Sequence, residues 1–205
     1  MTRPTFAAIV TAHRETPFAV MKNLATQTVQ PMEVFVGVSE FPLPWVVPSY
    51  PFTFVIVDSP NENDYGYRKR NRLLSLVTAD FVGFFSCDDS YDGDYIERML
   101  AAVETTGADV AYCQWDGAGL KGGDLCGFQP TESTLGNFII RTSLINEIGG
   151  FPSHEPYHNE GFRDARLIEE VRKRVTKIAR VNITMYHRNT PYDKSVRVTK
   201  WGKYL

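Results

Sequence analysis

Two adjacent carboxylates, Asp88 and Asp89, directly follow a predicted buried strand in the segment CDDSYD. Neighbouring carboxylates repel each other unless a cation or hydrogen-bond donors compensate their charge. A hard divalent ion takes one or two carboxylates and leaves its other positions to phosphates and water. The pair therefore predicts binding of a metal ion or a ribose. In the simpler interpretation Asp92 caps the next helix and the others line a turn, which explains Asp92 but not the pair.

Polar residues also follow the other predicted strands. In an open, mostly parallel sheet, ligands bind beyond the carboxyl ends of the strands, so these segments are expected to form one site. The segments are residues 11–15, 39–40, 58–63, 87–92 and 114–117. The first of them, TAHRE, lacks both GxGxxG and GxxxxGK[ST]. The absence of both motifs argues against a dinucleotide dehydrogenase or a P-loop enzyme.

Strands and helices alternate along the first 114 residues. Apolar runs predict strands at residues 6–12, 33–38, 52–57, 81–85, 109–114 and 180–186, and a further apolar run covers 135–140. Helical periodicity and capping signals predict helices near residues 17–27, 66–78, 92–106, 142–148 and 160–175. This alternation predicts an α/β fold with an open, mostly parallel sheet and helices on both faces.

Length and composition narrow the class of protein. The 205 residues, 43% hydrophobic and 22% charged, are typical of one globular domain. Because no apolar run approaches the roughly 20 residues of a membrane span, we expect a cytoplasmic protein with no transmembrane segment.

Three dispersed cysteines argue against a disulfide framework or a cysteine zinc site. HEPYH at residues 154–158 matches a zinc-protease motif, but Pro156 would break the helix that this motif needs.

Charge is distributed unevenly along the chain. Residues 151–205 hold 12 Lys/Arg against six Asp/Glu, whereas residues 1–150 hold 10 against 18. A positive C-terminal quarter suits an anionic ligand, such as one bearing phosphate. The alternative interpretation is a solvated helix followed by a soluble basic tail.

The order of these motifs resembles that of the family 2 inverting glycosyltransferases, which have the GT-A fold. FAAIVTAHRETP is similar to the opening strand and nucleotide loop, and PMEVFVGVSE to the second strand. NDYGYRKRN followed by FVGFFSCDDSYDGDYIERM resembles the Gly…Arg-Asn helix and the DxD strand. NFIIRTSLINEIGGF resembles the acceptor-side segment, and FRDARL lies where the family has its catalytic motif. The resemblance spans about residues 5–187, which predicts a GT-A domain at 1–187 and a basic tail at 188–205.

The resemblance implies roles for particular residues. Asp164 would act as the general base, and Arg70 would lie near the diphosphate of the donor. Asp89, Asp88 and His187 would bind Mn²⁺ or Mg²⁺, with Asp88 on the metal or the ribose. The residues expected to hold the base and ribose are Thr11, His13, Glu15, Ser39 and Glu40. Because Asp164 opens a predicted helix, whose dipole favours the ionised carboxylate, we expect a low pKa for it.

Four residues depart from the family pattern. Ser86 stands where many members have the first acid of the DxD motif, and Ser39-Glu40 replace paired aspartates. Arg163 replaces the glutamate before the catalytic aspartate.

The implied reaction transfers a hexosyl or pentosyl group from a UDP- or GDP-linked sugar to an acceptor hydroxyl, with inversion. The acceptor would be a glycan, a lipid-linked sugar, a protein or a modified nucleobase. Two alternatives remain open from the residues. One is a sugar-phosphate nucleotidyltransferase on a related sheet. The other is a non-catalytic module that binds carbohydrate or nucleic acid, for which the basic, aromatic tail is a typical composition.

Overall fold

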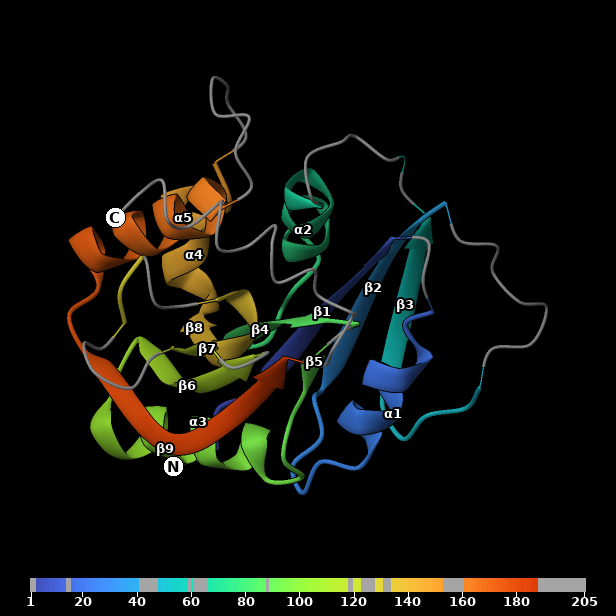
Figure 1. Ribbon diagram of the computed structural model, residues 1–205, viewed down its shortest axis with the longest axis horizontal. Helices are drawn as coiled ribbons and strands as arrows, with labels where there is room; N and C mark the ends of the chain where they lie inside the picture. The colour runs from blue at the N-terminus through green and yellow to red at the C-terminus, as the bar shows by residue number, and fades with distance from the viewer. Residues whose placement is uncertain are drawn as a thin grey trace.

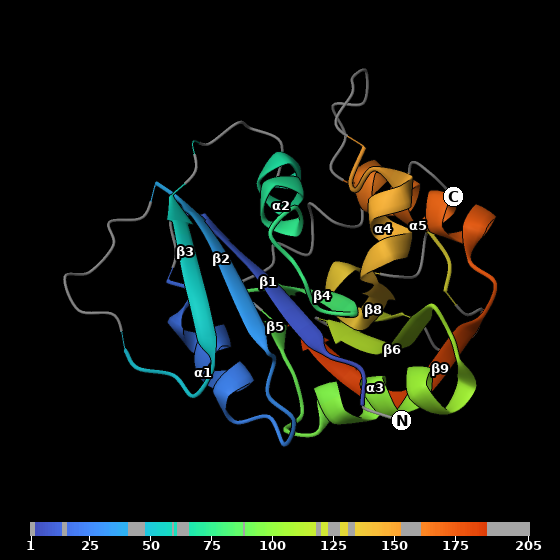
Figure 2. The same cartoon turned by 180° about the vertical axis from the view of Figure 1, so that it is seen from behind.

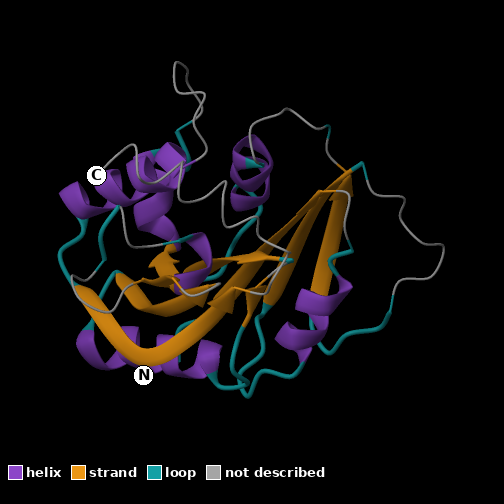
Figure 3. Ribbon diagram, viewed as in Figure 1, coloured by secondary structure: helices purple, strands orange, loops and turns teal. Residues whose placement is uncertain are grey.

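The computed structural model describes most of the chain. The described residues are 3–13, 16–40, 48–58, 60, 66–87, 89–117, 120–122, 128–130, 134–152 and 161–187. Within them, nine strands form one mixed sheet, with helices on both of its faces (Figures 1 and 3). The predicted α/β class is therefore confirmed.

Four parallel strands form the N-terminal half of the sheet, in the order β3-β2-β1-β4. They are β1 (Phe6–His13), β2 (Glu33–Ser39), β3 (Thr53–Asp58) and β4 (Phe81–Ser86). Their register places Thr11 beside Gly37 of β2 and beside Ser86 of β4, and it pairs His13 with Ser39. The carboxyl ends of these strands therefore meet at one edge of the sheet.

The other half of the sheet mixes strand directions. β8 (Phe138–Arg141) runs antiparallel to β4 and to β6 (Val110–Gly117), while β9 (Ile178–His187) runs parallel to β6. Two short strands, β5 (Asp89–Ser90) and β7 (Leu120–Gly122), pair antiparallel with β9 and β6. The sequence did not reveal these short strands, because two or three residues are too few to show a strand period.

Helices cover the sheet as two layers. The described α-helices are α1 (Phe18–Ala25), α2 (Tyr67–Leu74), α3 (Tyr95–Thr106), α4 (Thr142–Ile148) and α5 (Gly161–Arg174). A single 3₁₀ turn, η1 (Leu135–Asn137), precedes β8. Helices α1 and α3 pack on one face of the sheet, and α2, α4 and α5 on the other (Figures 1 and 2).

The central strand β1 explains why its sequence reads as an unbroken apolar run. Ala8 and Val10 pack into the core under α1 and α3, whereas Ala7 and Ile9 pack into the core under α2, α4 and α5. Successive side chains of a strand point to opposite faces. Both faces are covered here, so every position must be apolar rather than every second one.

The start of α3 differs from its prediction. Its N-cap is Asp94 rather than Asp92, and no side-chain capping bond is made. The Asp92 carbonyl instead accepts hydrogen bonds from Gln27 Nε2 at 2.8 Å and from the Tyr95 backbone N–H at 3.0 Å. The interpretation of Asp92 as a helix cap was therefore wrong, because that residue ties the α1 side of the sheet to α3 through its backbone.

Gly136 of η1 provides a test of the packing beside the DxD segment. A Cβ at this position would lie 2.6 Å from Tyr91 Oη and 2.7 Å from Asp89 Oδ2, closer than packed atoms tolerate. We predict that Gly136→Ala lowers the free energy of unfolding by about 1–3 kcal/mol, the usual cost of overpacking. Urea denaturation measures it, and Gly93→Ala is the matched control because its Cβ would meet only Thr26 O at 3.7 Å. Equal stability of both variants would contradict the packing.

Candidate functional site

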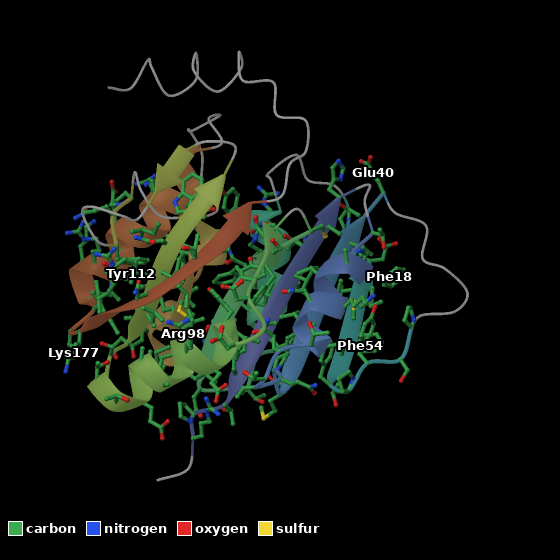
Figure 4. The ribbon with its side chains drawn as sticks, turned by 60° about the horizontal axis from the view of Figure 1, so that its bottom comes forward. Phe18, Glu40, Phe54, Arg98, Tyr112 and Lys177 are labelled. Carbon is green, nitrogen blue, oxygen red and sulfur yellow. The ribbon has the colours of Figure 1, made fainter. Side chains whose placement is uncertain are left out.

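The candidate site lies where the strand order reverses, between β1 and β4. Neighbouring connections leave in opposite directions at such a point, which creates the binding position of open α/β sheets. Thr11 and His13 lie in the C-terminal part of β1, Ser39 is the last residue of β2, and Glu40 follows it, as the sequence predicted. Figure 4 labels Glu40 where the chain leaves β2. Glu40 has a backbone φ of 54°, uncommon for a residue with a side chain, so the chain turns sharply as it leaves the sheet.

Lys69 of α2 joins the ends of β1 and β2, a role that the sequence did not reveal. Its Nζ donates to Ser39 Oγ at 2.7 Å and to the Ala12 carbonyl at 3.3 Å, and the residue is only 5% exposed. Its aliphatic stem crosses Gly37, where a Cβ would lie 2.5 Å from Lys69 Cδ. Ser39 Oγ also lies 3.2 Å from His13 Nδ1. The Gly-Val-Ser ending of β2 therefore makes room for a buried ammonium.

Arg70 lies on another side of the same helix. It is 9% exposed, and its Nη2 donates to Thr11 Oγ1 at 2.9 Å. Its guanidinium stacks over the Tyr67 ring at 5.5 Å and the Phe151 ring at 6.0 Å from the ring centroids. Arg70 is therefore buried and held against the end of β1, and it is not an exposed arginine on the helix surface.

Asn71 fixes the segment that follows α4. Its Nδ2 donates to the Phe151 carbonyl, and its Oδ1 accepts from the Phe151 backbone N–H, both at 2.8 Å. The preceding Gly150 has a φ of 75°, and a Cβ there would lie 2.5 Å from Asn71 Oδ1. The Arg-Asn and Gly-Gly-Phe motifs are therefore two halves of one contact, which the sequence alone did not reveal.

Asp164 of α5 reaches the site through Tyr67, the first residue of α2. The Tyr67 hydroxyl donates to Asp164 Oδ1 at 2.7 Å, and the Tyr67 ring packs against Phe151 with centroids 5.5 Å apart. Asp164 as a whole residue is half-buried. Tyr67 contacts both residues, through its hydroxyl bond to Asp164 and through the Arg70 guanidinium over its ring.

The pKa of Asp164 runs opposite to the expectation from its helix position. Burial raises the pKa of this carboxyl, while the Arg70 guanidinium and the Tyr67 hydrogen bond offset part of that rise. Protein atoms around the carboxylate replace water, which disfavours its charged form, and this outweighs the dipole of the helix. The expected low pKa was therefore wrong.

Asp89 is buried rather than presented on the surface. It is 5% exposed, its Oδ2 accepts from Tyr91 Oη at 3.2 Å, and the same oxygen packs against Gly136. Burial raises the pKa of Tyr91, so its hydroxyl stays protonated as a donor. Asp89 is paired with His187 in the β5–β9 register, which brings the backbones of two predicted metal ligands side by side.

Several predicted residues fall outside what the structure describes. They are Glu15, Asp88, the side chain of His187, both histidines of HEPYH and the tail at 188–205. Among the described residues, no group of three or more His, Cys, Asp or Glu side chains lies in a metal-binding arrangement. The described helices also include none that is long and apolar enough to cross a membrane.

Comparison with known proteins defines the class. Residues 50–154 match the model of glycosyl transferase family 2. The chain belongs to this family, and no curated protein matches its sequence.

Solved structures show the same GT-A fold. TarS of S. aureus superposes with a TM-score of 0.68 at 17% identity, over 92% of this chain and 37% of TarS. TarS 1–349 in complex with UDP superposes with a TM-score of 0.67 at 17% identity, over 91% of this chain and 61% of that chain. TarS 1–349 in complex with UDP-GlcNAc superposes with a TM-score of 0.68 at 16% identity, over 90% of this chain and 58% of that chain. The chain therefore spans less than two thirds of these TarS chains.

The raised pKa of Asp164 predicts that its charge weakens the fold. A group whose folded pKa exceeds its unfolded value contributes stability below the unfolded pKa and loses it as the pH rises through the folded pKa. We predict that Asp164→Asn raises the melting temperature at neutral pH, and that the gain shrinks under acidic conditions. Thermal melts across pH measure it.

Asp80→Asn is the matched control with the opposite sign. Hydrogen bonds from the Thr5 backbone and hydroxyl lower the pKa of Asp80, so its contribution is present above the unfolded pKa and is lost on acidification. This variant should lower the melting temperature at neutral pH. A destabilised Asp164→Asn protein at neutral pH would show that the carboxylate serves the fold instead.

Proposed function

We propose that this chain is a metal-dependent, inverting glycosyltransferase that moves a sugar from a nucleotide-diphosphate sugar to an acceptor hydroxyl. The observation that carries the proposal is the carboxylate of Asp164, held by the Tyr67 hydroxyl and influenced by the Arg70 guanidinium, which itself reaches the end of β1. Family membership supports the reaction class. An aspartate placed in this way is suited to accept a proton from an incoming hydroxyl.

The donor is proposed to bind across the ends of β1, β2 and β4. Thr11, His13, Ser39 and Glu40 line this edge, and Glu15 and Asp88 complete the proposed set. The complexes of TarS 1–349 with UDP and UDP-GlcNAc support a uridine nucleotide sugar as the first donor to test. Arg70, whose guanidinium reaches Thr11 Oγ1, supplies positive charge near the proposed diphosphate position.

The donor set at the β5–β9 pair fits a hard cation in its chemistry. Carboxylates are the protein ligands that Mg²⁺ and Mn²⁺ take, and the register brings residue 89 beside residue 187. We propose Asp88, Asp89 and His187 as the residues that would hold the ion. A bound cation would offset the negative charge of the departing diphosphate.

Asp164 is proposed to act as the general base. Its carboxylate takes the proton of the acceptor hydroxyl while the acceptor oxygen forms a bond to the anomeric carbon. The bond from that carbon to the diphosphate oxygen breaks on the opposite side, and its electron pair leaves with the nucleoside diphosphate. Configuration at the anomeric carbon is therefore inverted. The raised pKa suits this role, because a more basic carboxylate is a better proton acceptor wherever it remains ionised.

Donor binding provides the first test. We expect UDP-GlcNAc or another nucleotide sugar to bind in the presence of Mn²⁺ and to lose most of its affinity when a chelator is added. Asp88→Asn should remove the effect of the ion, and Asp94→Asn, which lies before α3, is the matched control. Asp89 is less suitable for replacement because it is buried against Gly136. Calorimetry that finds the same affinity with and without chelator would contradict metal dependence.

Turnover provides the second test. We predict that Asp164→Asn lowers the rate of nucleotide release from the donor by roughly 10²–10⁴-fold, as for a lost general base, and changes donor affinity by only a few-fold. Glu169→Gln, an exposed acid on the same helix, should retain the wild-type rate. A folded Asp164→Asn protein with wild-type turnover would exclude Asp164 as the base.

A further inference from the structure

We propose that Tyr67 is a positioning residue, which aims the carboxylate of Asp164 and links it to the donor side of the site through Arg70. This inference rests on the proposed function. Tyr67 would not touch the reacting atoms itself and would act through Asp164.

The first support is the contact itself. Tyr67 Oη donates to Asp164 Oδ1 at 2.7 Å, a length typical of a well-formed hydroxyl–oxygen hydrogen bond. A hydroxyl carries a single proton, so this bond commits the only hydrogen of Tyr67 to one carboxylate oxygen. Hydrogen bonds to a charged acceptor are stronger than neutral ones. The bond therefore restricts rotation of the Asp164 carboxylate. It engages Oδ1 and leaves Oδ2 as the oxygen that can face an acceptor hydroxyl.

The second support is the rigidity of Tyr67. The residue is 3% exposed, with the Phe151 ring on it at 5.5 Å and the Arg70 guanidinium over it at 5.5 Å. Phe151 is held in turn by both amide atoms of Asn71. Catalytic groups need supporting residues whose own conformations are locked by packing. Tyr67 meets this condition, because its ring is enclosed by packed neighbours.

The third support is the path to the donor side. Tyr67 and Arg70 are three residues apart on α2 and therefore lie on one helix face. Arg70 stacks on Tyr67 and donates to Thr11 Oγ1 at the end of β1. The Arg70 guanidinium and the Tyr67 hydroxyl both favour the ionised form of Asp164. The helix thus joins the proposed donor edge to the proposed base.

The test is Tyr67→Phe in the full chain, with Mn²⁺ and UDP-GlcNAc as the probe and release of UDP as the measurement. Losing the donated hydrogen bond removes an influence that lowers the pKa of Asp164, so the acid limb of the pH–rate profile should move to higher pH. We expect kcat to fall roughly 10–100-fold, the usual range for a hydrogen bond to a charged group, with KM for the donor almost unchanged. Tyr95→Phe loses a comparable buried hydroxyl bond, to the Gly136 carbonyl at 2.9 Å, and should keep the wild-type acid limb.

A double-mutant cycle separates positioning from a structural role. If Tyr67 acts through Asp164, Tyr67→Phe should have almost no further effect on turnover in an Asp164→Asn background. Additive losses in the cycle, or an acid limb that stays in place, would overturn the inference while leaving the proposed function intact. Absence of nucleotide release by the wild-type chain from every UDP- and GDP-linked sugar tested would instead overturn the proposed function. Thermal melts check folding, and Tyr67→Met, which likewise lacks the hydroxyl donor, replaces Tyr67→Phe in the cycle if that variant does not fold.

Discussion

The side chain of Asn71 holds both polar atoms of the Phe151 backbone, and the site depends on this pair of hydrogen bonds. They tie α2 to the segment after α4, which places the Phe151 ring against Tyr67 and under the Arg70 guanidinium. Gly150 is required beside this contact because a Cβ would overlap the Asn71 amide. The Phe84 ring also packs against the Phe151 ring, with centroids 4.9 Å apart.

The site concentrates charge where the fold has little water. Lys69 and Arg70 are both nearly buried, and Asp164 has its pKa raised by burial. Burying charged groups costs stability unless partners compensate them. The compensation includes backbone and hydroxyl groups, such as the Ala12 carbonyl, Ser39 and Tyr67. Such an arrangement is typical of a functional site, where local stability is lower than packing alone would allow.

Much of the architecture could be predicted from local pattern. The strand and helix at 6–13 and 142–148 agree with their predicted ranges within one residue, because apolar runs and capping signals are local properties. The residues that end β1 and β2 could be placed at one edge because parallel strands end together. The direction of β8 and the pairing of β5 with β9 could not be predicted, since strand direction depends on which distant segment is adjacent.

The sequence by itself determined the order of the elements, the edge where polar residues gather, and the chemical types available there. Tertiary structure alone decided which of those residues meet. Tyr67 and Asp164 are 97 positions apart, and Asn71 and Phe151 are 80 apart, so no local periodicity encodes their contacts. The sign of the Asp164 pKa shift was likewise decided by packing. A helix start favours the charged form, but removal of water by α2 and its neighbours disfavours it more strongly.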